Sequence, residues 1–305
     1  MTSMLNLFLL LIVAVAIPGL INRTRAKLAG RKGIRFLQHI YNVRLMLRKG
    51  AVYSTTTSVL FRVAPSVYLG AAFCALLFIP VGDLPPVLSF DGDLIAFAYT
   101  LALGRVALVL AAMDTGSPFE GMGASREALY GALAEPALML VLATMALITG
   151  NTSFEGLFNV GMTLELKYVI VFLLAAYVLM KLVFTESGRV PVDDPRTHLE
   201  LTMIHEVMCL DYSGVDMAMI KMAGWCKTAA FSMLAANCIT SGLAWGWWAS
   251  APLAILLSGL SIGIVESTQA RNKLVRNTTF ILTIAALGAL VFFTGYLMKL
   301  NIVLE

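Results

Sequence analysis

The feature that most constrains this chain is its series of long apolar segments, each close to the length of a membrane-spanning helix. A helix needs about 20 residues to cross a hydrocarbon core about 30 Å thick. Backbone groups in lipid must pair within their own segment, so each segment is predicted to be helical. The segments lie at about 4–22, 63–81, 94–113, 128–149, 168–185, 215–243, 250–267 and 278–299. The sequence therefore predicts a bundle of about eight transmembrane helices.

Composition points to the same class of protein. Hydrophobic residues make up 59% of the 305 residues and charged residues only 13%, whereas soluble domains are about 25% charged. We therefore expect an all-α integral membrane protein with a single transmembrane domain over 1–305. The first apolar segment has its basic residues after it rather than before it, so it is predicted to be a retained helix and not a cleaved signal peptide.

The distribution of Lys and Arg predicts how the chain lies in the membrane. Ten of the 22 Lys and Arg residues fall in 23–62, and the loop 82–93 has none. Further basic residues occur in the alternate loops 114–127, 186–212 and 268–277. Cytoplasmic loops are enriched in Lys and Arg. These segments are therefore predicted to be cytoplasmic, with both termini on the other face of a bacterial or archaeal type cytoplasmic membrane.

Residues 34–50 are too polar to span a bilayer. Apolar and basic side chains are interleaved there, which is typical of an amphipathic helix lying at the membrane interface. Two interpretations remain open. The helix is either a surface anchor or one wall of an entrance to a cavity that faces the cytoplasm.

The sequence contains no motif for a redox or metal centre. Its four cysteines form no CxxC pair, and iron–sulfur clusters or structural zinc need clustered thiolates. His198 and His205 would lie about 10.5 Å apart along a helix, too far to share an ion. No catalytic or phosphate-binding motif is present, and basic residues that follow a membrane interface give no support for nucleic-acid binding. We expect no catalytic residue and no metal ligand here.

Several charged residues lie within or beside the apolar segments. They are Arg105, Glu135, Lys181, Lys221, Lys227 and Glu266. Charge inside a membrane is costly, so it marks either function or helix packing. Two interpretations stay open: internal salt bridges that fix helix positions, and a relay that transfers protons.

Two cytoplasmic loops are predicted to be structured. In 114–127, glycines and a proline indicate turns, and Ser125 is predicted to cap the next helix, with Arg126 and Glu127 in its first turn. The second loop, about 186–214, interleaves carboxylates with apolar residues. It is either a solvated surface loop or a segment that dips into a polar cavity.

Motifs in these segments resemble a known family of membrane subunits. The motifs are Arg25-Ala26-Lys27 to Arg31-Lys32-Gly33, Leu37-Gln38, 114–119, 123–127, Glu135-Pro136, Glu186, Arg189, Pro191, Asp193, Glu200-Leu201, 212–214, Glu266, Ala270 and Arg271. Together they run nearly end to end. The chain is similar to the membrane subunit, known as ND one in respiratory complex I, that complex I shares with energy-converting NiFe hydrogenases such as formate hydrogenlyase. The motif at 114–127 favours the hydrogenase branch.

The sequence also departs from the family pattern. Ile34 and Asn42 stand where many relatives have proline and aspartate. Residues 195–198 read Pro-Arg-Thr-His where complex I has an acid-rich stretch, which favours the hydrogenase branch over quinone binding.

The resemblance implies a coupling subunit without a catalytic centre, which joins a soluble redox arm to ion-pumping membrane subunits. Its partners would be hydrogenase-like large and small iron–sulfur subunits on the cytoplasmic side and antiporter-like subunits in the membrane. Iron–sulfur clusters and a NiFe centre would lie in those partners, with no cofactor in this chain. Two alternatives remain: a quinone-chamber subunit of a complex I type NADH:quinone oxidoreductase, and a stand-alone ion transporter.

For this coupling role we expect a set of acids with basic partners. The candidate proton-coupling acids are Asp114, Glu135, Glu186, Asp193, Glu200 and Glu206. The expected supporting charges are Arg126, Arg189, Arg196 and Glu266. Carboxylates in a low dielectric have raised pKa values, which suits them to exchange protons.

Overall fold

The computed structural model describes residues 2–161, 166–194, 203–242 and 246–300. The elements in these ranges are helical, with no named strand among them. They are α1 (Thr2–Leu28), α2 (Gln38–Leu47), α3 (Val59–Leu77), α4 (Asp93–Asp114), α5 (Pro118–Thr149), α6 (Phe154–Gly161), α7 (Leu166–Glu186), the 3-10 helix η1 (Glu206–Cys209), α8 (Gly214–Gly242), α9 (Trp247–Thr268) and α10 (Leu274–Lys299).

Seven of these helices are long and apolar enough to cross a membrane. They are α1, α3, α4, α5, α7, α9 and α10. The remaining predicted span, 215–243, coincides with α8, which is less apolar because its buried residues include Lys227, Ser232 and Asn237. The all-helical membrane bundle expected from the sequence is confirmed, and its most polar long helix lies in the interior.

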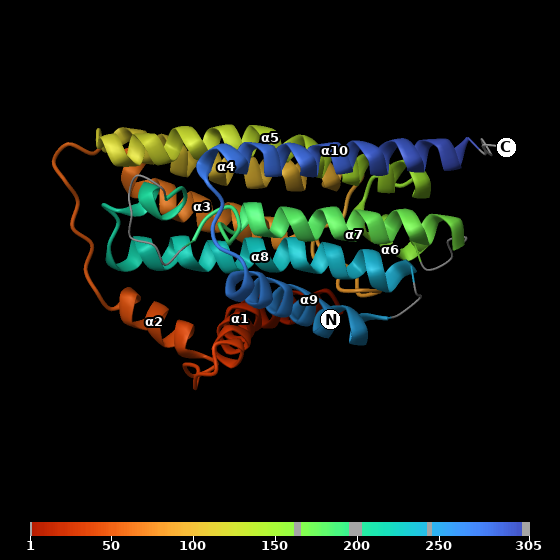
Figure 1. Ribbon diagram of the computed structural model, residues 1–305, viewed down its shortest axis with the longest axis horizontal. Coiled ribbons are helices and arrows are strands. Elements are labelled where there is room, and N and C mark those ends of the chain that lie inside the picture. The colour runs from red at the N-terminus through yellow and green to blue at the C-terminus, as the bar shows by residue number, and fades with distance from the viewer. Residues whose placement is uncertain (1, 162–165, 195–202, 243–245, 301–305) are drawn as a thin grey trace.

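The long helices lie side by side, with α8 in a central position (Figure 1). α8 packs against α3, α7, α9, α1 and α2, while α10 packs against α5 and α7. α1 and α9 pack together at the edge of the bundle and cross the other helices obliquely (Figure 1). The short α2 lies outside the main bundle at one end (Figure 1).

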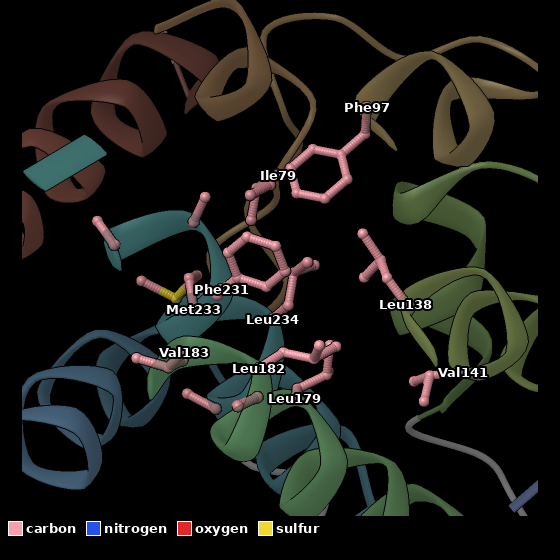
Figure 2. Packing of buried hydrophobic residues seen from close by; sticks show 14 of the residues in the cluster. Ile79, Phe97, Leu138, Val141, Leu179, Leu182, Val183, Phe231, Met233 and Leu234 are labelled. Carbon is pink, nitrogen blue, oxygen red and sulfur yellow. The ribbon is translucent and has the colours of Figure 1, made fainter. Parts of the chain in front are cut away.

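The core between α4, α5, α7 and α8 is apolar. Side chains from all four helices converge there, as Figure 2 shows for Phe97, Leu138, Leu182 and Phe231. These side chains are buried. Such packing fixes the distances between the helices, and so it determines where the charged side chains on the same helices can meet.

Glycines allow α1 and α9 to approach closely. A side chain at Gly259 would meet Leu20, and a side chain at Gly263 would lie 2.6 Å from Thr24 Cβ. The two glycines are four residues apart on one face of α9, which is the small-residue spacing that brings membrane helices into backbone contact. The cytoplasm-side ends predicted for both helices therefore lie next to each other.

The predicted amphipathic segment contains α2, which is shorter than 34–50. Val43 is its buried residue, whereas Leu37, Tyr41 and Leu45 are exposed. The ring of His39 makes a hydrogen bond of 2.8 Å with the backbone carbonyl of Val15 and packs edge-on against Trp225. These contacts attach α2 to α1 and α8.

The prediction that Ser125 caps the helix after the 114–127 loop is wrong. α5 already begins at Pro118, with Ser117 as its N-cap residue, and the Ser125 hydroxyl donates to the Met122 carbonyl inside the helix. Proline at the first helical position has its backbone torsion preset. Gly123 is tolerated in the helix because Val207 of η1 occupies the space where its side chain would be. The expected loop is mostly a helical extension.

Candidate functional site: a buried chain of charged residues

Arg105 of α4 lies at the centre of a cluster of ionised groups. Its Nη1 is 2.7 Å from Glu135 Oε1, its Nη2 is 2.5 Å from Glu186 Oε1, and its Nε is 3.5 Å from Glu127 Oε1. The Arg105 side chain is only 9% exposed. A guanidinium has donors in a fixed planar arrangement, and here it contacts three carboxylates from two other helices.

The spacing of residues on α5 explains how the guanidinium fits. Glu127, Gly131 and Glu135 are four residues apart, so they lie one above another on one face of the helix. The guanidinium of Arg105 lies directly against Gly131, where any side chain would collide with it. The missing side chain creates the space, and the two glutamates on either side supply the negative charge.

The network continues from Glu186 to α8. Lys227 Nζ is 2.6 Å from Glu186 Oε2, and the Lys227 side chain is 3% exposed. Glu186 is the last residue of α7. It therefore bridges Arg105 and Lys227 at the point where the chain leaves the bundle and enters the acidic loop.

A second branch runs from Glu127 into that loop. His205 Nε2 is 3.2 Å from Glu127 Oε2, and His205 Nδ1 is 3.6 Å from Asp193 Oδ2. The other oxygen of Asp193 is 3.9 Å from Arg271, just before α10. The ion pairs thus form one continuous chain from Lys227 in the bundle to Arg271.

Asp193 also organises the loop backbone. Its Oδ2 accepts hydrogen bonds from the backbone amides of Ile204 and His205, each at 3.1 Å. Asn277 of α10 donates to the Val192 carbonyl at 2.7 Å. Gly188 has a positive φ of 58° and lies against the His205 ring, so a side chain there would be both strained and obstructed. The described part of the loop is held inside the protein and is not a solvated segment.

Electrostatics shift the pKa values of the two loop residues in opposite directions. Burial alone would lower the pKa of His205, but the negative charge of Glu127 and the hydrogen bond to Asp193 raise it above its ordinary value. Burial alone would raise the pKa of Asp193, but its hydrogen bonds with His205 and Ile204 lower it. Both shifts favour the charged forms, so this contact is an ion pair near neutral pH.

The loop also lines a cavity of about 410 Å³ between α1, α3 and α8. Polar groups of the loop face it together with apolar side chains of α8, among them Met217 and Ile220. Glu186, Asp193 and His205 belong both to the wall of the cavity and to the charged chain. The arrangement can therefore couple the contents of the cavity to the charge state of buried carboxylates.

The structure brings only some of the predicted site residues together. Glu135, Glu186 and Asp193 belong to the buried network, and Glu206 lies on the cavity wall. Asp114 is outside both, because its carboxylate accepts a 2.7 Å hydrogen bond from the Ser58 backbone amide at the start of α3. Glu200 lies outside the described residues.

The predicted supporting charges also divide. Arg189 and Arg25 both pair with Glu266, at 3.1 and 3.3 Å, in a separate cluster beside α9. Arg126 donates to the Met203 carbonyl at 3.0 Å and so supports the loop backbone. Arg196 lies outside the described residues.

Sequence reasoning missed four members of the network. Arg105 and Lys227 were recognised as charges within apolar segments but were given no place in the site, and Glu127 and His205 were placed in loops. The four-residue spacing of Glu127, Gly131 and Glu135 is a signal that could have revealed the cluster. Within the described ranges, no group of three or more His, Cys, Asp or Glu residues is arranged to hold a metal ion.

Comparison with known proteins identifies the family. The sequence matches the protein family described as NADH dehydrogenase over residues 1–300. The chain belongs to this family. It is 29% identical to hydrogenase-4 component C of Escherichia coli over 94% of each chain, and 30% identical to formate hydrogenlyase subunit 4 of the same organism over 72% of this chain and 70% of that one.

The fold is also that of a solved relative. A chain in the membrane-bound sulfane sulfur reductase, described as an archaeal respiratory membrane complex, superposes with a TM-score of 0.75. The two chains are 21% identical, and the match covers 96% of this chain and 98% of the other. The resemblance to the hydrogenase branch of this family of membrane subunits is confirmed.

Lys227 provides a test of the network's energetics. Lys227→Met removes one of the two cations that contact Glu186 and leaves a buried carboxylate undercompensated. We expect a loss of about 3–5 kcal/mol in the free energy of unfolding in detergent, and partial recovery when Glu186→Gln is added. Lys221→Met, on the exposed face of the same helix, should change stability by about 0.5 kcal/mol or less. Equal effects of the two Lys variants would contradict an ion pair at Lys227.

The shifted pKa of His205 predicts a pH dependence of stability. Its raised pKa means that charged His205 stabilises the fold fully below its unfolded value of about 6.5. That contribution is lost as pH rises through the folded pKa. The thermal stability lost in His205→Gln should therefore be largest near pH 6 and shrink toward pH 9. In His39→Gln the trend should be reversed, because burial lowers the pKa of His39. A His205→Gln deficit that does not vary with pH would exclude the charged pair.

Proposed function

We propose that this chain is the membrane-anchor and coupling subunit of an energy-converting hydrogenase or hydrogenase-like complex. In this role it links electron transfer in a docked soluble arm to translocation of protons or sodium ions. The observation that carries the proposal is the continuous chain of buried ion pairs from the loop residue Asp193 through His205, Glu127 and Arg105 to Glu135. The names of the Escherichia coli relatives support the same assignment.

The two ends of this chain suit the two sides of a coupling subunit. At one end, His205 and Asp193 line a cavity beneath the acidic loop, where a docked redox partner can alter the local charge. At the other end, the side chain of Glu135 is 45% exposed. Glu135 is thus the network member that a neighbouring membrane subunit can reach, which suits it to exchange a proton with that subunit.

Charge balance gives the network its response. Glu127, Glu135, Glu186 and Asp193 supply the negative charge, and Arg105, Lys227 and Arg271 supply the permanent positive charge. A protonated His205 completes the balance. Because buried groups interact through a low dielectric, a change of charge beside His205 alters the cost of ionising each carboxylate along the chain. Protons can then be taken up or released at Glu135.

The proposal specifies partners, cofactors and orientation. Hydrogenase-like large and small subunits would dock over the acidic loop and carry the iron–sulfur clusters and a NiFe centre, and antiporter-like subunits would lie beside the helices. The Lys and Arg residues of 23–62 favour a cytoplasmic location for that end, with both termini on the opposite face.

A second candidate function rests on the 410 Å³ cavity. Its apolar side could hold the head of a quinone, and the chain is 24% identical over 72% of its length to a membrane subunit of the NADH-quinone oxidoreductase of Streptomyces avermitilis. The match covers 49% of that relative. Quinone-dependent electron transfer by the intact complex, abolished by filling the cavity with Thr228→Trp, would favour this alternative.

Isolation of the assembly tests the proposed function first. The chain, tagged and extracted in mild detergent, is expected to co-purify with a hydrogenase-like large subunit, an iron–sulfur small subunit and antiporter-like subunits, identified by mass spectrometry. Cysteines in the large subunit would then show whether it can hold a NiFe centre. A chain that purifies alone and monodisperse would contradict the coupling role and would support a stand-alone transporter.

Glu135 tests the coupling route within that assembly. Glu135→Gln keeps the size of the side chain but cannot ionise. We expect it to abolish ion translocation in proteoliposomes and to leave electron transfer to an artificial acceptor unchanged. Glu155→Gln, a carboxylate of α6 outside the network, is the matched control and should leave both activities unchanged. Parallel loss of both activities in Glu135→Gln would instead indicate a structural role.

A further inference from the structure

A groove at the edge of the bundle lies apart from the charged network. It has a volume of about 630 Å³ and is formed by the C-terminal ends of α1 and α9 with the turn that follows α1. One side is apolar, where Leu260 and Ile264 of α9 are 41% and 46% exposed. The other side is basic, with Arg23, Lys27 and Arg31.

The basic side of the groove is not neutralised within the described part of the chain. Arg23 and Lys27 are one helical turn apart, and Arg31 follows in the turn. All three are exposed, none has an ion-pair partner among the described residues, and no carboxylate from these residues lines the groove. Arg25 lies between them in sequence but pairs with the buried Glu266. Three cations thus surround one concave surface without a counterion from the described ranges.

An adjoining hollow of about 570 Å³ extends the basic surface. It shares Arg31 with the groove and adds Lys32. Glu266 also lines this hollow, but its carboxylate is already engaged by Arg25 and Arg189. This neighbouring negative charge is therefore neutralised, and the electrostatic potential at Arg23, Lys27 and Arg31 stays positive.

We propose that this groove binds one anionic diacyl phospholipid. The phosphate lies among Arg23, Lys27 and Arg31, and an acyl chain runs along Leu260 and Ile264 of α9. Membrane-spanning helices end at the level of the lipid headgroups. A groove at that level with cations on one side and exposed aliphatic side chains on the other matches a phospholipid in both charge and polarity. A soluble anion would use only the basic side.

The close contact of α1 with α9 explains why a lipid here is a structural component. Gly259 and Gly263 bring the two helices together, and the groove begins at Leu20, which packs on Gly259. A lipid in the groove covers the outer edge of this contact. It also offsets the repulsion between three neighbouring cations.

The test is the lipid content of the purified complex. The complex is extracted from membranes that contain phosphatidylglycerol and phosphatidylcholine, and bound lipids are identified by native mass spectrometry. The variant Arg23→Gln/Lys27→Gln/Arg31→Gln should lose one tightly held phosphatidylglycerol. Each cation near an anionic headgroup contributes about a factor of five in affinity, so the three together correspond to roughly 100-fold. The control Arg44→Gln/Arg48→Gln/Lys49→Gln alters an equally exposed basic group and should retain the lipid.

A second pair of variants tests the acyl side and remains informative if the triple variant fails to fold. Leu260→Trp fills the groove and should displace the same lipid, whereas Leu256→Trp changes an exposed residue one turn earlier on α9, outside the groove. Equal retention in all variants, equal loss in variants and controls, or equally tight binding of phosphatidylcholine would overturn the proposal. A photo-crosslinker at residue 260 that captures a partner subunit instead of a lipid would also overturn it.

Discussion

The buried guanidinium of Arg105 is the interaction on which the rest of the structure depends. Transfer of an ion from water into a protein interior costs several kcal/mol even after relaxation, so this cation requires compensating charge on every side. α4 supplies the arginine, α5 supplies Glu127 and Glu135, and α7 supplies Glu186. Apolar packing in lipid gives little directional preference. The ion pairs therefore decide which faces of these helices meet.

The same residues connect helix packing to the fold of the acidic loop. Glu186 ends α7, and its contact with Lys227 fixes where the loop begins. Asp193 then accepts two backbone amides from the far side of the loop, which brings His205 to Glu127. A change at either end therefore reaches the other through charges in contact, and no large movement of the backbone is required. This organisation suits a protein that passes a signal without a redox centre of its own.

Much of the fold could be predicted from the sequence, because long apolar segments in lipid have almost no alternative to helices. The loop at 114–127 was predicted less well, since Gly121 and Gly123 indicate turns unless η1 packs against the helix and needs the space. The site was predicted in part. Glu135, Glu186 and Asp193 could be named from motifs, but Asp114 proved to be a partner of the α3 N-terminus. The roles of Arg105 and Lys227 depend on which helices are neighbours, and no local pattern specifies that.

Gly131 has a mechanical consequence for α5. It lies one helical turn from Glu127 and one from Glu135, with the guanidinium of α4 pressed against it. A slide of α5 along α4 by one turn, about 5.4 Å, would bring a glutamate side chain into the position of the glycine and into the guanidinium. The arginine thus acts as a stop against piston motion in either direction. Whatever passes along α5 must travel as protons and charge on a stationary rod.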